Sequence, residues 1–103
     1  MIDAIALHRA ELEELCRRFH VQRLDLFGSA AREDFDPEHS DIDFVVEFDP
    51  GDPAALSLKT YFGLKDSLEA LLGCAVDLVE AGAVRNPYLK ASIEGSREPL
   101  FEA

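Results

Sequence analysis

Two aspartates separated by one residue, Asp41 and Asp43, are the part of this sequence best suited to chemistry. In a strand, residues i and i+2 lie on one face, with Cα atoms roughly 6.5–7 Å apart. Two carboxylates held this close cost stability unless a cation binds between them. All-oxygen ligands suit Mg²⁺, which also binds phosphate oxygens. The alternative is a solvated sheet face that carries these acids without binding a metal.

A third carboxylate, Asp77, interrupts the apolar run 75–79. An unpaired Asp is costly to bury in such a strand. If this strand lies beside the strand of Asp41 and Asp43, all three carboxylates converge and could share metal ions. In the alternative, Asp77 lies at an exposed edge or forms a salt bridge with a lysine.

Gly28 and Ser29 end an apolar strand, and Ser29 lies twelve positions before Asp41. The N-terminus of the short helix that we expect after them would attract an anion. Gly28 lets the backbone approach closely, and the Ser29 hydroxyl is a further donor. Alone, the pair could equally be an ordinary turn with a helix cap. Together with the carboxylates it forms a phosphate site next to a metal site, where an attacking oxygen could be activated and pyrophosphate could leave.

The elements that must position these residues follow from periodicity and capping signals. The alternation of 41–48 points Ile42 and Phe44 toward a core and the two aspartates away from it. Leu100 and Phe101 are expected to pack back on that core. The predicted fold class is α/β (α+β), a short mixed β-sheet flanked by helices. The expected elements are helix 3–19, strand 22–27, short helix 30–33, strand 41–48, helix 55–72 ended by Gly73, strand 75–79, and a helix from 86 to about 94 with Gly95 loosening its end.

Length and charge restrict the function classes further. The 103 residues suit a single domain, and 21 acids against 10 Lys and Arg give a net charge of −11. This charge disfavours direct binding of nucleic acid, because it repels a phosphate backbone. The sequence shows neither a membrane span nor a signal peptide, so we expect a cytoplasmic protein. Cys16 and Cys74 follow no metal-binding spacing and are expected to be free thiols.

The run 26–32 (Leu-Phe-Gly-Ser-Ala-Ala-Arg), followed by Ser-Asp-Ile-Asp-Phe at 40–44, resembles the nucleotidyltransferase superfamily related to DNA polymerase beta. The length, the helical ends and the segment 84–88 resemble its minimal nucleotidyltransferase (MNT) group. The resemblance implies one minimal nucleotidyltransferase domain over 1–103 with the polymerase beta-like fold. Position 30 is Ala where many relatives carry a larger residue, and position 33 is Glu where Gly is frequent.

The resemblance also implies roles for individual residues. Gly28 and Ser29 would bind the triphosphate of ATP, the substrate. Asp41 and Asp43 would hold two Mg²⁺ ions, and Asp77 would help to hold a metal and accept the proton of the acceptor hydroxyl. Arg32 matches an arginine common after the Gly-Ser motif, which either touches phosphate or forms a structural salt bridge.

Such minimal proteins are commonly the antitoxins of HEPN/MNT toxin–antitoxin pairs. We therefore expect an enzyme, a protein adenylyltransferase that transfers AMP from ATP to a hydroxyl, typically of Tyr, on a cognate helical HEPN-type toxin. The two proteins would then form a hetero-oligomer. One alternative is an antitoxin that masks a basic partner by binding alone. Another is transfer to a small molecule of the aminoglycoside type, for which this chain would have to build the substrate pocket by oligomerising.

Overall fold

The computed structural model describes residues 3–28, 31, 41–53 and 57–103. Within these ranges, no helix is long and apolar enough to cross a membrane. The elements are α1 (Asp3–Leu7), α2 (Arg9–Arg18), β1 (Val21–Phe27), β2 (Ile42–Phe48), α4 (Leu58–Leu72), β3 (Val76–Glu80), the 3₁₀ helix η2 (Ala81–Ala83), α5 (Pro87–Ser96) and β4 (Glu98–Glu102).

The described strands form one four-stranded sheet in the order β3-β2-β1-β4. β1 is antiparallel to both β2 and β4, whereas β2 and β3 are parallel. The predicted mixed sheet flanked by helices is therefore confirmed. β4 is an addition to the prediction, which left the secondary structure of the C-terminal tail open. Leu100 in β4 is almost completely buried, so the expectation that the tail packs on the core is correct.

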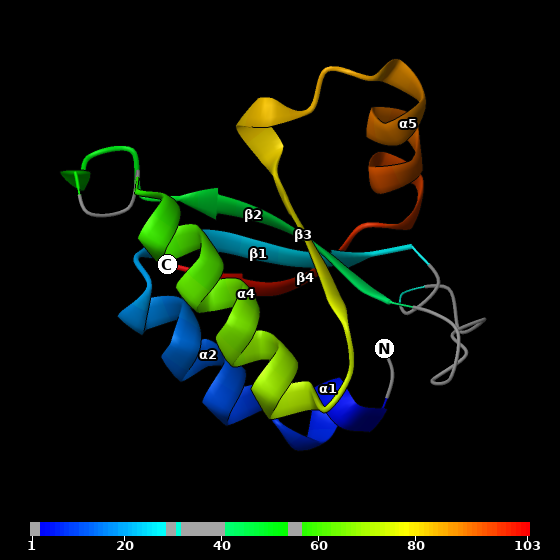
Figure 1. Ribbon diagram of the computed structural model, residues 1–103. Helices are drawn as coiled ribbons and strands as arrows, with labels where there is room; N and C mark the ends of the chain where they lie inside the picture. Colours follow the sequence, from blue (N-terminus) through cyan, green and yellow to red (C-terminus); the bar gives the residue numbers. More distant parts are fainter. Residues whose placement is uncertain (1–2, 29–30, 32–40, 54–56) are drawn as a thin grey trace.

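One face of the sheet is covered by α1, α2 and α4, and the main core lies between them (Figure 1). Strand alternation places the side chains as the sequence predicts, since Ile42, Phe44 and Val46 are fully buried on this face. The other buried members of this core are Ile5, Leu12, Leu15, Cys16, Val21, Leu24, Leu26, Leu64, Leu68, Leu72, Val76, Leu78 and Leu100.

The opposite face of the sheet carries the segment 81–87 and α5, which arch over it (Figure 1). A smaller apolar cluster of Phe27, Val45 and Ile93 anchors α5 to this face. Val45 lies on the same side of β2 as the aspartates, as predicted, but it is only 2% exposed because Ile93 covers it. This face is therefore only partly open to solvent.

Local signals set most of the helix ends. α4 begins at Leu58 rather than at 55, because Ser57 caps it by accepting a hydrogen bond from the Thr60 N–H (3.1 Å). Gly73 ends α4 in the left-handed conformation, with φ of 72°. The predicted helix 3–19 is in fact two helices, α1 and α2, which meet at His8.

The helix after Asn86 has the predicted start but a later end. Asn86 caps α5 by accepting hydrogen bonds from two backbone N–H groups, and Pro87 occupies its first turn. Gly95 lies inside the helix, which continues to Ser96, so the expectation of an end near residue 94 was wrong. The Ser96 hydroxyl donates to the Ser92 carbonyl (2.9 Å) and accepts a hydrogen bond from the N–H of Gly28, the residue after β1, and these contacts hold the last turn in place.

Candidate active site

Asp43 and Asp77 are register partners on the adjacent parallel strands β2 and β3. Neighbouring strands are separated by roughly 4.8 Å, so the two residues lie side by side. Their flanking residues Phe44, Val76 and Leu78 are buried in the main core, which directs both carboxylates to the opposite face. Asp77 is also exposed on the edge strand β3. Its position therefore agrees with both alternatives from the sequence: it lies beside the strand of Asp43, and it lies at an exposed edge.

Asp41 lies immediately before β2, two residues from Asp43, and its side chain is exposed. The Ile42 N–H donates a hydrogen bond to the Ala75 carbonyl (3.0 Å), which ties the start of β2 to the start of β3. The Cys74 thiol lies close enough to Asp41 for the charge of this carboxylate to affect its pKa. Burial and then the charge of Asp41 raise the pKa of the Cys74 thiol. The thiol is therefore protonated near neutral pH and is a poor metal ligand there.

The fit of the carboxylates to Mg²⁺ depends on how closely their oxygens are gathered. Among the described residues, no group of three or more His, Cys, Asp or Glu side chains is gathered closely enough to hold a metal ion. Asp43 and Asp77 do provide adjacent oxygen ligands, and Asp41 lies two residues before Asp43. Mg²⁺ commonly binds one or two carboxylates and completes its shell with water and substrate phosphates. The donor chemistry and the register therefore fit this ion.

Gly28 lies directly against Asp43. Its φ is 74°, and a Cβ built on it would lie 3.3 Å from the Asp43 Cγ and would overlap the carboxylate oxygen. The Gly28 carbonyl accepts a hydrogen bond from the Ala31 N–H (3.1 Å), as in a tight turn after β1. Two predicted site residues, Ser29 and Arg32, and most of the predicted short helix lie outside the described residues.

Two contacts from α4 fix the start of β3 and so the position of Asp77. The Glu69 carboxylate accepts a hydrogen bond from the Val76 N–H (3.1 Å). This bond lowers the pKa of Glu69, and the nearby Lys65 lowers it further, although desolvation by burial acts in the opposite direction. The Tyr61 hydroxyl donates to the Leu78 carbonyl. Burial and then the charge of Asp77 raise the pKa of Tyr61, so this phenol stays protonated.

A buried ion pair beneath α5 was missed in the sequence. Asp25 in β1 is completely buried and accepts hydrogen bonds from Arg97 and from Arg23 (3.2 Å). Burial lowers the pKa of Arg97, but the bond to Asp25 and the charges of Asp25 and Glu94 outweigh it and raise the pKa overall. An Asp between Leu24 and Leu26 in a predicted strand was the available signal. It did not reveal that the partner lies 72 residues away.

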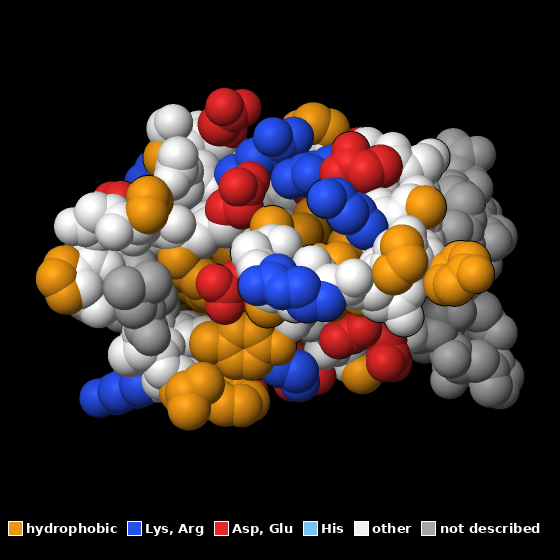
Figure 2. Space-filling view, turned by 90° about the horizontal axis from the view of Figure 1, so that it is seen from above, with side chains coloured by type: hydrophobic (Ala, Val, Ile, Leu, Met, Phe, Trp, Pro, Cys, Tyr) orange, Lys and Arg blue, Asp and Glu red, His pale blue; other side chains and the backbone are white. Residues whose placement is uncertain are grey.

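The side of the molecule on which α5 lies carries positively charged side chains as well as acids. Figure 2 shows Lys and Arg side chains gathered there among Asp and Glu side chains, with hydrophobic groups between them. Besides Asp25, Arg97 also pairs with Glu47 (3.6 Å) and Glu94 (3.2 Å). Despite the net charge of −11, this side of the molecule therefore carries cations as well as acids.

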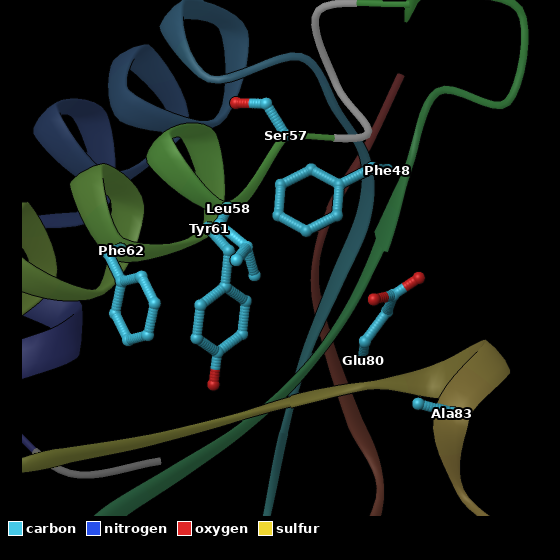
Figure 3. Close-up of a pocket in the computed structure, with 7 residues that line it drawn as sticks. All are labelled: Phe48, Ser57, Leu58, Tyr61, Phe62, Glu80 and Ala83. Atoms are coloured by element: carbon cyan, nitrogen blue, oxygen red, sulfur yellow. The ribbon is translucent and has the colours of Figure 1, made fainter.

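A separate cavity of about 310 Å³ lies at the other end of the strands (Figure 3). Phe48 and Glu80, at the ends of β2 and β3, line it together with the first turn of α4. The Tyr61 side chain extends across it toward β3 (Figure 3). Asp43 and Asp77 lie near the beginnings of the same strands, so this cavity is not part of the carboxylate site.

Comparison with known proteins gives matches over most of the chain. The family described as "Nucleotidyltransferase domain" matches residues 9–100. Protein adenylyltransferase MntA of Thermococcus cleftensis is 36% identical over 86 residues, which cover 84% of this chain and 79% of MntA.

Solved structures share the fold. A structure described as a minimal nucleotidyltransferase has a TM-score of 0.74 and 34% identity, covering 96% of this chain and 97% of that one. The MNT antitoxin in complex with a tri-AMPylated HEPN toxin from Shewanella oneidensis has a TM-score of 0.66 and 23% identity. That alignment covers 95% of this chain and 72% of the other.

Proposed function

The chain belongs to the family of nucleotidyltransferase domains, and we propose that it is a single-domain protein adenylyltransferase that acts as an antitoxin. It transfers AMP from ATP to a hydroxyl, in our proposal that of a tyrosine, on a helical HEPN-type toxin. The observation that carries the proposal is the register of Asp43 with Asp77, which places two carboxylates of the motif side by side. The name of the MntA relative supports transfer to a protein.

In this proposal, Asp43 and Asp77 would hold Mg²⁺ side by side, and Asp41 would supply the further carboxylate that the motif implies. When bound, the ion would neutralise charge on the triphosphate and polarise the phosphorus that is attacked. Gly28 contributes space rather than charge, because a Cβ at this position would overlap the Asp43 carboxylate oxygen. Ser29 and Arg32 are the proposed contacts of the triphosphate, since they follow Gly28 in the motif.

The transfer is an in-line substitution at the α-phosphorus of ATP. The acceptor oxygen forms a bond to this phosphorus while the bond to the bridging oxygen of pyrophosphate breaks. The acceptor proton passes to the Asp77 carboxylate, which is exposed on the edge strand and so accessible from a partner. Pyrophosphate leaves with the electrons of the broken bond.

A toxin partner follows from the fold neighbour and from the shape of the site. The Shewanella MNT antitoxin is bound to a HEPN toxin that carries AMP. In this chain, Asp77 is exposed on the edge strand β3, where an acceptor hydroxyl on another protein can approach it. The cytoplasm, where both ATP and such a toxin are available, is the proposed location.

The test mixes the purified protein with α-labelled ATP, Mg²⁺ and the helical product of the neighbouring gene. We expect label and one or more AMP mass increments on the partner. Asp43→Asn and Asp77→Asn should each lower the rate at least about 10²-fold, since each removes a charge that the transition state requires. Glu80→Gln is the matched control, because Glu80 is an exposed acid on the same strand. Failure to transfer AMP with Mg²⁺, Mn²⁺ or Co²⁺ would refute the proposal.

The net charge of −11 supports a second candidate, an antitoxin that neutralises a basic toxin by binding alone. The same Asp43→Asn variant separates the two functions. Under the masking function it still protects cells from the toxin, whereas under the transfer function protection is lost although the two proteins still bind.

A further inference from the structure

The last turn of α5 is bonded directly to the end of β1. The Ser96 hydroxyl accepts a hydrogen bond from the Gly28 N–H (3.0 Å) and donates one to the Ser92 carbonyl (2.9 Å). Because the hydroxyl is used both as acceptor and as donor, its orientation is fixed. This bond joins residues that are 68 positions apart in the sequence.

The hydrogen bond determines what Gly28 can do. Its N–H is occupied by Ser96, so Gly28 acts through its position and not as a phosphate donor. That position is constrained on the other side by Asp43, whose Cβ would lie 3.5 Å from a Cβ built on Gly28. A shift of Gly28 therefore changes the space in which the Asp43 carboxylate can rotate.

Ser96 is itself held in place by the residue that follows it. Arg97 bonds the completely buried Asp25 in β1, and the cluster of Ile93 with Phe27 and Val45 anchors the preceding turn. The end of α5 is thus fixed to β1, the strand that Gly28 directly follows. A hydroxyl on this turn can therefore hold the backbone of Gly28 with little freedom.

We propose that Ser96 is a positioning residue for the transfer site, which holds Gly28 against Asp43 and thereby sets the orientation of a metal-binding carboxylate. The inference rests on the proposed function for its effect on catalysis, but not for its effect on metal binding. It adds to the Gly-Ser and Asp-x-Asp motif a residue from the C-terminal helix.

The experiment compares Ser96→Ala, which removes the hydroxyl, with Ser96→Thr, which retains it. Gly95→Ala is the control, because it changes the same turn and a Cβ there meets no atom within 4 Å. For Ser96→Ala we expect a roughly 10-fold or greater fall in kcat with little change in KM for ATP, since small misplacements of a catalytic group reduce the rate strongly. Ser96→Thr should recover most of the rate, and Gly95→Ala should retain it.

Two readouts do not require AMP transfer. Hydrogen exchange of the Gly28 amide, followed by NMR, should accelerate at least about 10-fold in Ser96→Ala and not in Ser96→Thr. Binding of Mn²⁺ alone, titrated by EPR, should weaken at least about threefold in Ser96→Ala. Unchanged Gly28 exchange together with unchanged Mn²⁺ binding overturns the inference. If these change as expected while the wild type transfers no AMP, the positioning role stands and the proposed function fails.

Discussion

Gly28 and Asp43 are in direct contact, so that a side chain on Gly28 would displace the Asp43 carboxylate. A Cβ on Gly28 would lie 3.3 Å from the Asp43 Cγ and closer still to its carboxylate oxygen. The two residues belong to different motifs in the sequence, fifteen positions apart, and the pairing of β1 with β2 brings them together. The glycine of the Gly-Ser motif therefore has a steric function at the carboxylate site.

Gly28→Ala should reduce AMP transfer at least about 10²-fold, because the new methyl group displaces the Asp43 carboxylate. Gly73→Ala is the matched control, since Gly73 has nearly the same φ, 72° against 74°, but no atom within 4 Å of a Cβ. Both variants should lose about 1–2 kcal/mol of stability through the left-handed backbone. Activity assays with urea unfolding measure both effects. Equal activity of the two variants would show that the contact with Asp43 is unimportant.

Arg97→Met should destabilise the protein by about 3 kcal/mol, because it leaves the completely buried Asp25 with Arg23 as its remaining ion-pair partner. Arg97→Lys should recover part of this loss, since it keeps the charge but not the planar guanidinium. Urea unfolding at pH 7 measures the free energies. A loss below about 0.5 kcal/mol in Arg97→Met would contradict a structural role for the pair.

Gly63→Ala should be less stable than Gly95→Ala by about 1–3 kcal/mol. Both glycines lie inside helices, so each variant gains similar helix propensity. A Cβ on Gly63 would lie 2.7 Å from the Phe19 ring between α2 and α4, whereas one on Gly95 meets nothing within 4 Å. Thermal or urea unfolding of both variants gives the difference. Equal stabilities would mean that the Phe19 ring moves aside without cost.

Glu69 should contribute to the loss of stability in acid. Its pKa in the folded protein lies below the ordinary value of 4.5, so its stabilisation is present above that value and is lost as pH falls through the folded pKa. The stability advantage of the wild type over Glu69→Gln should therefore be full near pH 7 and shrink below about pH 4.5. Urea unfolding at pH 7 and pH 3 tests this. An advantage that does not shrink in acid would exclude titration of Glu69 as its cause.

Most of the fold could be read from local patterns, because those patterns act over a few residues. The alternation in 41–48 determined which side of β2 is buried, and Asn86-Pro87 and Gly73 determined helix ends. The C-terminal strand could not be assigned in this way, because Glu98–Glu102 is stabilised by pairing with β1 rather than by its own pattern.

The sequence by itself determined the chemical groups of the candidate site, since their types and spacing form a recognisable motif around Gly28, Asp41 and Asp43. Tertiary structure decided three further relationships: the register of Asp43 with Asp77, the bond from Ser96 to Gly28, and the pairing of Asp25 with Arg97. Each joins residues on different elements. Spacing along the chain specifies the face on which a side chain lies, but only the packing of strands and helices specifies which side chain it meets.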